Sequence, residues 1–240
     1  MREIYYIVQD VLNDKELFTH QIRENITNNY YWSDDWSENF YINLAKAGFI
    51  STTYDTKEGL VLLPELQYAY ALLDFKDLHI SEKVKKLLKK QNYTFTINTK
   101  FDEVLDAISK THKYNWLKDK YIEVMKNIYT KNSFENFKLV SVELCDKETN
   151  ELISGEIGYI IGETYTSLTG FSSREKVHNN YGTLQLVLLA KYLQERKFSF
   201  WNLGHPHMEY KKRLGAKVYK RKDFLQRWDK ATLLPTINLI

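Results

Sequence analysis

The chain has 240 residues, of which 43% are hydrophobic and 27% charged, as expected of a folded globular protein. Its net charge of +3 is too small to indicate nucleic-acid binding by itself, so the placement of the basic residues matters more than their sum. The sequence has no apolar run near the roughly 20 residues that span a bilayer, no N-terminal pattern of a secretory signal, and one cysteine, Cys145. These features predict a cytoplasmic protein without a disulfide or a membrane partner.

The chain is predicted to consist of a small helical or mixed region, 1–60, followed by a main domain, 61–240. An amphipathic helix in the first region ends at Gly48. Polar, turn-forming residues at 53–59 mark the boundary between the two parts.

Strands and helices alternate through the main domain. Apolar or alternating runs predict strands at 60–63, 68–73, 93–97, 140–144, 152–161, 164–169 and 198–203. Helical periodicity predicts helices at 81–90, with Ser81 as N-cap, and at 101–109, 116–129 and 183–194. A turn at 146–150 joins two of the strands in a hairpin. This order, built around one long buried helix, predicts a mixed α/β sheet flanked by helices.

The helix at 81–90 carries an unusual number of lysines. Val84, Leu87 and Leu88 have the spacing of a buried stripe. The remaining faces carry five lysines, namely Lys83, Lys85, Lys86, Lys89 and Lys90. These charges repel one another, and a phosphate backbone would convert the repulsion into affinity through counterion release. A solvated helix face is the simpler explanation, and this helix alone slightly favours it.

The entry to the helix at 183–194 bears on the identity of an acyl donor. A CoA site needs a basic residue followed by closely spaced glycines, so that backbone N–H groups reach the pyrophosphate. Here Gly182 is the one glycine, and the bulk of Tyr181 is expected to block the approach. Close packing of helix on strand equally explains Gly182. The sequence thus weakens a CoA-dependent reading without excluding it.

The strand at 198–203 ends in candidate polar residues. The carboxamide of Asn202 can accept a hydrogen bond from an amine and donate one to a carbonyl. His205 and His207 flank a proline with no cysteine or carboxylate motif beside them, so loop histidines are expected rather than a metal site. No Ser-His-Asp order, phosphate loop or H-E-x-x-H motif occurs in the sequence.

Seven segments, in the same order, resemble the leucyl/phenylalanyl-tRNA–protein transferase family, whose fold is GNAT-like without a CoA site. The resemblance extends from about Phe40 to Trp228 and includes Leu214-Gly215-Ala216 followed by Arg221-Lys222-Asp223-Phe224-Leu225. Its specificity comes from the order of the seven segments rather than from any one of them. The seven segments are 39–49, 77–81 with the lysine-rich helix, 115–117, 152–158, 171–172, 214–216 and 221–225.

The resemblance implies an aminoacyltransferase that moves an amino acid from aminoacyl-tRNA to the free α-amine of a protein, with no metal or cofactor. It also implies that the lysine-rich helix grips the tRNA acceptor stem, which now favours a function for its five lysines. Trp116 and Phe171 would wall the terminal adenosine and the amino-acid side chain, with Ser172 and Leu168 in the same substrate-binding region. A monomer is expected.

The sequence departs from the family at the relay and acceptor positions. The family's Asp-x-Gln falls on Phe200-Trp201-Asn202, so the Asp is absent and Asn202 replaces Gln. The family's acidic residue in Gly-Glu-Ser-Met-Phe-Ser falls on Leu168. Asn202 and Glu156 are therefore the candidate catalytic residues, with Glu156 or Glu163 as replacement acids.

These departures predict a divergent transferase whose acceptor need not be a basic N-terminal residue. A different protein or peptide terminus, or a small amine, fits as well. Two other readings stay open. One is a GNAT N-acetyltransferase that uses acetyl-CoA, and the other is a catalytically inactive module that binds tRNA or peptide.

Overall fold

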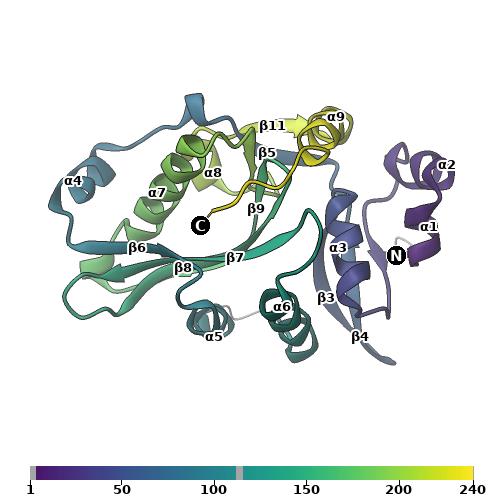
Figure 1. The fold of residues 1–240 in the computed structure, drawn as a ribbon, viewed down its shortest axis with the longest axis horizontal. Helices are drawn as coiled ribbons and strands as arrows, with labels where there is room; N and C mark the ends of the chain where they lie inside the picture. The colour runs from purple at the N-terminus through teal and green to yellow at the C-terminus, as the bar shows by residue number, and fades with distance from the viewer. Residues whose placement is uncertain (1–3, 112–115, 240) are drawn as a thin grey trace.

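A seven-stranded mixed sheet forms the centre of the computed structural model, which describes residues 4–111 and 116–239 (Figure 1). The strands are β5 (Ala69–Leu73), β6 (Tyr93–Ile97), β7 (Lys138–Asp146), β8 (Leu152–Ile161), β9 (Thr164–Ser172), β10 (Phe200–Asn202) and β11 (Lys217–Lys220). Their order is β11-β5-β10-β9-β8-β7-β6. Within this sheet β9 and β10 run parallel, and the other neighbouring pairs are antiparallel.

Helices cover both faces of the sheet, which confirms the predicted mixed α/β class. Helices α4 (Glu82–Lys90) and α7 (Tyr181–Glu195) lie on one face, and α5 (Phe101–Thr111) and α6 (Asp119–Lys131) lie on the other (Figure 1). Each face has its own buried apolar cluster, one built around α7 and the other around α5 and α6. The chain closes with α8 (Glu209–Leu214) and α9 (Arg221–Thr232), the latter packed in the second cluster.

The N-terminal part adds two small sheets and three helices. Its helices are α1 (Gln9–Asn13), α2 (Lys15–Phe18), which continues into a π-helical turn (Thr19–Arg23), and α3 (Glu38–Lys46). Its strands are the parallel pair β1 (Tyr5–Tyr6) and β2 (Tyr31–Trp32), and the hairpin of β3 (Ile50–Thr56) and β4 (Gly59–Glu65). Short 3-10 helices at Phe75–Asp77 and Lys176–His178 complete the described elements.

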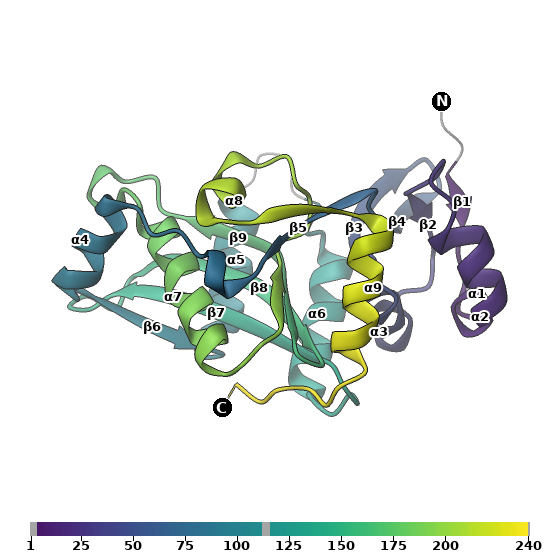
Figure 2. The same cartoon turned by 90° about the horizontal axis from the view of Figure 1, so that it is seen from above.

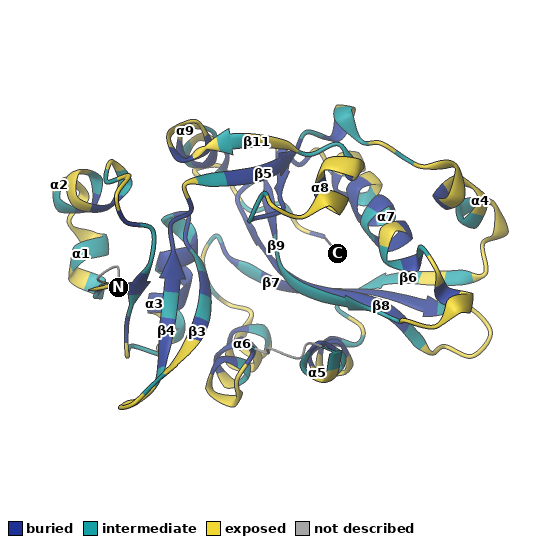
Figure 3. Ribbon diagram, turned by 180° about the vertical axis from the view of Figure 1, so that it is seen from behind, coloured by how far each residue is buried: buried dark blue, intermediate teal, exposed yellow. Residues whose placement is uncertain are grey.

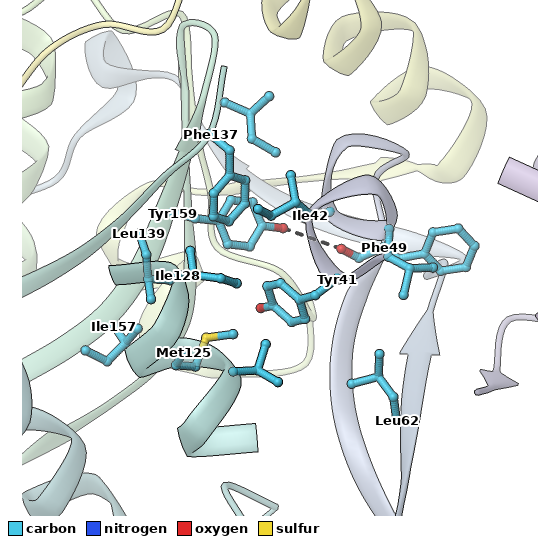
Figure 4. Close-up of a cluster of buried hydrophobic side chains, with 14 of the residues drawn as sticks. Tyr41, Ile42, Phe49, Leu62, Met125, Ile128, Phe137, Leu139, Ile157 and Tyr159 are labelled. Atoms are coloured by element: carbon cyan, nitrogen blue, oxygen red, sulfur yellow. Dashed lines mark hydrogen bonds between the residues drawn. The ribbon is translucent and has the colours of Figure 1, made fainter. Parts of the chain in front are cut away.

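The N-terminal part packs directly on the central sheet. In Figure 4 the Tyr159 hydroxyl of β8 reaches the backbone oxygen of Phe49, 3.4 Å away. The Tyr41 hydroxyl of α3 similarly lies 2.9 Å from that of Tyr121 in α6. The predicted division at residue 60 falls inside β4, and two separate domains remain a prediction.

Local signals fixed several element ends as expected. The Ser81 hydroxyl accepts a hydrogen bond from the Val84 N–H and caps α4. Gly48 adopts a φ of +96° immediately after α3, a conformation that favours glycine. The carboxylate of Asp146 accepts N–H bonds from Glu148 and Thr149, both 2.9 Å long, and so closes the β7–β8 hairpin.

Three expectations need correction. The segment 53–59 was predicted as a polar turn, but β3 continues to Thr56 because it pairs with β4, Thr53 opposite Leu62. The helix predicted from Trp116 begins at Asp119, and the strand predicted to end at Thr169 continues to Ser172. Asn115, part of one family-like segment, lies outside the described residues.

The site-forming feature of the fold is the separation of β9 from β10. The two strands pair only as far as Thr166, opposite Asn202. β9 then continues along β8 with a register shift that places Ile157 opposite Thr169 and Gly158 opposite Ser167, which leaves Leu168 bulged between them. The sheet therefore opens at the carboxyl end of β10, where Lys211 of α8 donates a hydrogen bond to the Leu203 carbonyl. Figure 2 shows α8 in the region of β9.

Candidate functional site

A cleft of about 1040 Å³ opens where β9 and β10 separate. Its floor comes from β8 and from the second half of β9, residues 167–172. One wall is the first turn of α7 with the loop before it, and the opposite wall carries residues of α8 and the segment leading to it. A cleft of this size accommodates a ligand as large as a nucleoside with an attached amino acid.

Glu156 supplies a buried carboxyl group in the cleft. Its side chain comes from β8, and its Oε1 accepts hydrogen bonds from the Tyr165 and Ser167 hydroxyls, each 2.8 Å long. Burial raises the pKa of Glu156 to about 7, against the lowering effect of these two bonds and of the Lys211 charge. A carboxyl group with this pKa can take up and release a proton at neutral pH, as a general base must.

Lys211 supplies a positive charge in the opposite wall. It is 5% exposed, and its Nζ donates to the carbonyl oxygens of Leu203 (2.5 Å) and His205 (2.7 Å). Burial lowers the pKa of Lys211 to about 8, while the charge of Glu156 opposes that shift. At neutral pH the ammonium is therefore still mainly protonated.

A polar network holds Glu156 in place. The Gln185 Nε2 of α7 lies 3.5 Å from Glu156 Oε2, and the Ser154 hydroxyl donates to Gln185 Oε1. Ser167, which donates to Glu156, accepts a 2.9 Å bond from the Trp201 indole N–H. The carboxyl group is thus fixed from β8, β9, β10 and α7 together.

All four residues predicted to bind substrate line this cleft. Trp116, Leu168, Phe171 and Ser172 line it together with Glu156. The ring of Trp116 stands edge-on against Tyr121 at 5.1 Å between centroids, which orients it. Leu168 is the bulged residue of β9 and lines the cleft, so the bulge places an apolar side chain in it.

Asn202 does not line the cleft. It is 1% exposed, its Nδ2 lies 3.3 Å from Thr166 Oγ1, and its Oδ1 accepts a 2.9 Å bond from the Gly204 N–H. These contacts hold the end of β10, and a catalytic role for Asn202 stays a prediction. Glu163 lies at the other end of β9, where it accepts a bond from the Ser199 hydroxyl.

Sequence reasoning missed Gln185 and Lys211. Gln185 had a usable signal, because it is a polar residue within the mostly apolar first turns of a buried helix. Lys211 had none, since it is one of three consecutive basic residues, and only the fold turns it inward.

The lysine-rich helix connects to the cleft through the start of α7. All five of its lysines are exposed, while Val84 is buried. In Figure 3 much of α4 has the colour of exposed residues. The Tyr181 hydroxyl donates a 3.0 Å bond to Asn92, two residues after α4 ends. Its neighbour Gly182 lines the cleft, so the start of α7 contacts both the segment that follows the lysine-rich helix and the cleft.

The positions of Tyr181 and Gly182 at the start of α7 change the argument against a CoA site. Tyr181 is buried and does not line the cleft, so the prediction that its bulk blocks the approach was wrong. Gly182 serves close packing instead, because a Cβ there would lie 2.9 Å from the Ser172 hydroxyl oxygen. Without a side chain, the start of α7 can approach β9 this closely.

The rings of His205 and His207 lie 4.5 Å apart. Within residues 4–111 and 116–239, no three His, Cys, Asp or Glu side chains gather as a metal site would require. The helices of that same part are too short or too polar to cross a bilayer.

Comparison with known proteins gives concordant matches. The model of the leucyl/phenylalanyl-tRNA protein transferase family matches residues 72–229. A leucyl/phenylalanyl-tRNA–protein transferase of Maridesulfovibrio salexigens is 27% identical over 174 residues, 70% of this chain and 67% of that protein. One of Shewanella sediminis is 31% identical over 154 residues, 60% of this chain and 58% of that protein. The matches thus leave a third or more of these relatives uncovered.

Among solved structures, the crystal structure of FemX aligns with a TM-score of 0.47 and 13% identity, covering 88% of this chain and 75% of that one. A tandem GNAT protein from the clavulanic acid biosynthesis pathway aligns with a TM-score of 0.41 and 9% identity, covering 81% and 65%.

Proposed function

Because its residues 72–229 match the family model, this chain belongs to the leucyl/phenylalanyl-tRNA–protein transferase family, and we propose that it transfers an amino acid from aminoacyl-tRNA to a free amine. The observation that carries the proposal is the cleft between β9 and β10, where the buried carboxyl group of Glu156 lies among predicted substrate-binding residues. The proposed enzyme acts as a monomer in the cytoplasm, where charged tRNA is available.

The proposed reaction asks for positioning and for proton transfer. The aminoacyl ester is already activated, so a neutral amine can attack its carbonyl carbon once both are held together. A C–N bond forms, the C–O bond to the terminal ribose breaks, and the proton of the amine passes through Glu156 to the departing hydroxyl. The raised pKa of Glu156, about 7, suits both proton transfers at neutral pH.

The donor enters over the lysine-rich helix. Its exposed lysines neutralise acceptor-stem phosphates, and the link from Asn92 to Tyr181 leads from that helix to the cleft. At the cleft, Trp116 and Phe171 offer flat apolar surfaces for the terminal adenosine and for the transferred side chain.

The acceptor, by this proposal, has an uncharged or acidic N-terminal side chain. Leu168 occupies the position where the family's acid would attract a basic one. The charged residues that line the cleft include three cations, Arg174, Lys176 and Lys211, and two acids, Glu156 and Glu175. Arg or Lys at the acceptor terminus would therefore meet net repulsion.

The test is transfer of radiolabelled amino acids from a set of charged tRNAs to peptides with basic, neutral and acidic N-termini. We expect transfer that prefers the non-basic peptides, and Leu168→Glu should move the preference toward Arg and Lys. Glu156→Gln should lower the rate by about 100-fold or more, the usual contribution of a general base. Glu163→Gln is the matched control, because it removes an acid outside the cleft.

Absence of transfer from every charged tRNA to every acceptor would overturn the proposal. Calorimetric binding of CoA would then point to an acetyltransferase, and tRNA binding without turnover to an inactive binding module. A wild-type rate for Glu156→Gln would remove the carboxyl group from the mechanism.

A further inference from the structure

Lys211 has no part in the proton transfers assigned to Glu156, yet its ammonium group is buried in the wall of the same cleft. Building on the proposed transfer reaction, we propose that the Lys211 ammonium binds the oxyanion that forms on the ester carbonyl when the amine attacks. Lys211 is thereby a catalytic residue of the reaction, distinct from the base.

The hydrogen bonds of Lys211 fix its ammonium and leave a donor for a ligand. An ammonium group has three N–H donors. Two are held by the carbonyl oxygens of Leu203 and His205, at 2.5 and 2.7 Å. Within the described residues Lys211 forms no ion pair within 4.0 Å, although Glu156 acts on it electrostatically. The ammonium group is thus anchored by two neutral acceptors, and no carboxylate pairs with it directly.

The placement of Lys211 suits a carbonyl held between two walls. Glu156 comes from β8 on the floor, whereas Lys211 comes from α8, across the gap between β9 and β10. A carbonyl lying in the gap has the base on one side and the cation on the other. A fixed charge in a site of low dielectric stabilises a developing negative charge far more than it would in water.

Burial without such a role is hard to explain energetically. Moving an ammonium group out of water costs several kcal/mol, and the two carbonyls that Lys211 binds are neutral. A neutral donor would satisfy them at lower cost. The charge of Glu156 offsets part of this cost, and the third N–H of the ammonium remains for a ligand.

The step balances without any further reactant. Attack forms the C–N bond and puts the negative charge on the carbonyl oxygen, which accepts the third Lys211 N–H. When the oxyanion collapses, the C–O bond to the ribose breaks, and the departing oxygen takes the proton that Glu156 had received from the amine. Lys211 keeps all three protons throughout.

The groups that face Lys211 determine how its role depends on pH. They are Glu156 on β8, His205 in the preceding loop, and Tyr210 on α8, whose ring centroid lies 5.8 Å from the Nζ. Burial, with His207 and Lys211, lowers the pKa of His205, so it stays neutral, and burial raises that of Tyr210 to about 12. Glu156, with a pKa of about 7, is mostly ionised above pH 8, so the change that matters there is loss of the Lys211 proton, whose pKa is about 8.

The experiment measures single-turnover transfer at saturating charged tRNA and acceptor peptide for Lys211→Met and Lys211→Arg. We expect Lys211→Met to lose about 100- to 1,000-fold in rate, as when an oxyanion donor is removed, with tRNA affinity within about twofold. Lys211→Arg should retain more activity, and the ratio of the wild-type rate to the Lys211→Arg rate should fall above pH 8, because only the lysine deprotonates there. The ratio cancels the titration of the acceptor amine, which is common to both.

A third variant separates charge from folding. Cys145 is the one native cysteine and is buried, so Lys211→Cys in a Cys145→Ser background can be alkylated selectively with 2-bromoethylamine. The product carries an ammonium group at nearly the lysine length and should recover most of the rate. Alkylation with iodoacetamide, which adds a neutral group, is the matched control and should not.

Three results would overturn the inference while leaving the transfer activity in place. The first is a Lys211→Met rate equal to wild type at saturation. The second is an effect of Lys211→Met on the KM of the acceptor alone. The third is a Lys211→Cys rate that iodoacetamide restores as fully as 2-bromoethylamine does. If the wild-type protein itself transfers nothing, the proposed function and this inference fail together.

Discussion

At the scale of single residues, the burial of Glu156 lowers the stability of the folded protein and raises the pKa of the carboxyl group to a value suited to proton transfer. It is buried between β8, β9 and α7, where a neutral amide would satisfy the same hydroxyl donors. The hydroxyls of Tyr165 and Ser167 stabilise the ionised form, but burial outweighs them and raises the pKa to about 7. Residues with perturbed pKa values of this kind are characteristic of functional sites.

This trade-off predicts that Glu156→Gln stabilises the protein increasingly as the pH rises. The pKa of Glu156 is about 7 when folded and near 4.5 when unfolded, so between these values folding takes up a proton and wild-type stability falls with pH. Relative to wild type, the variant should gain about 2–3 kcal/mol between pH 4.5 and 7, and little more above. Urea unfolding of both proteins at pH 5 and pH 8 measures the difference.

Glu163→Gln provides the comparison for that stability change. It removes a carboxylate that accepts a hydrogen bond from Ser199 and lies outside the cleft. A Glu156→Gln difference that does not change with pH would mean that the Glu156 carboxyl group is as well solvated in the folded protein as in the unfolded chain.

At the scale of elements, α4 shows what a local pattern can specify. Its Ser81 cap, its buried Val84 and its exposed lysines all follow from spacing along one helix, and all were predicted. The β7–β8 hairpin was predicted for the same reason, because Asp146 closes its turn through neighbouring residues.

Features that depend on distant partners were not predictable. Residues 53–56 are polar and look like a turn, but pairing with β4 makes them a strand. The bulge at Leu168 arises from the register between β8 and β9, and the inward position of Lys211 arises from carbonyls at the end of β10. The cleft depends on these long-range features, so its contents were only partly foreseen.

For α4 we predict a specific effect on salt dependence. Replacing Lys85, Lys86, Lys89 and Lys90 with Ala should weaken tRNA binding. It should also reduce the slope of log K against log salt by about 3, since each phosphate contact contributes about 0.7–0.9. Fluorescence titration of tRNA at several salt concentrations gives both slopes.

The control removes an equal charge elsewhere. Lys15, Lys57, Lys222 and Lys230 are exposed and lie outside α4, so their replacement with Ala changes the net charge identically. We expect this control to keep the wild-type slope. Equal slope changes in both variants would show that tRNA responds to overall charge, and an unchanged slope in the first would remove α4 from the interface.

At the scale of the whole molecule, Arg221 joins the N-terminal part to the rest. It is 3% exposed at the start of α9, and its guanidinium donates to five backbone carbonyls, those of Ile22, Asn25, Asn28, Leu66 and Gln67. Three of these carbonyls belong to the segment between α2 and β2. In addition, the Trp228 indole N–H of α9 donates a 2.8 Å bond to the Lys46 carbonyl at the end of α3.

These contacts predict that the chain unfolds as one cooperative unit despite its two predicted regions. Its five tryptophans report on both parts, Trp32 and Trp36 on the first, and Trp116, Trp201 and Trp228 on the second. With 5-fluorotryptophan labelling, all five fluorine resonances should lose intensity at the same urea concentration. Arg221→Met should lower the free energy of unfolding by about 3 kcal/mol or more, because several buried carbonyls lose their donors. The urea midpoint of all five resonances should fall together.

Arg227→Met is the matched variant, since Arg227 lies on the same helix but pairs with the carboxylate of Asp74, 2.5 Å away, with side chains 30% and 21% exposed. The loss in free energy of unfolding should be smaller than for Arg221→Met, because one partly exposed carboxylate loses its partner rather than five backbone carbonyls. If Trp32 and Trp36 instead unfold at lower urea than the other three, the N-terminal part is an independent unit, and Arg221 anchors it without making folding cooperative. In each of the three proteins, one midpoint shared by all five tryptophans would show that the N-terminal part and the central sheet unfold as one event, because Arg221 and Trp228 of α9 hydrogen-bond to both.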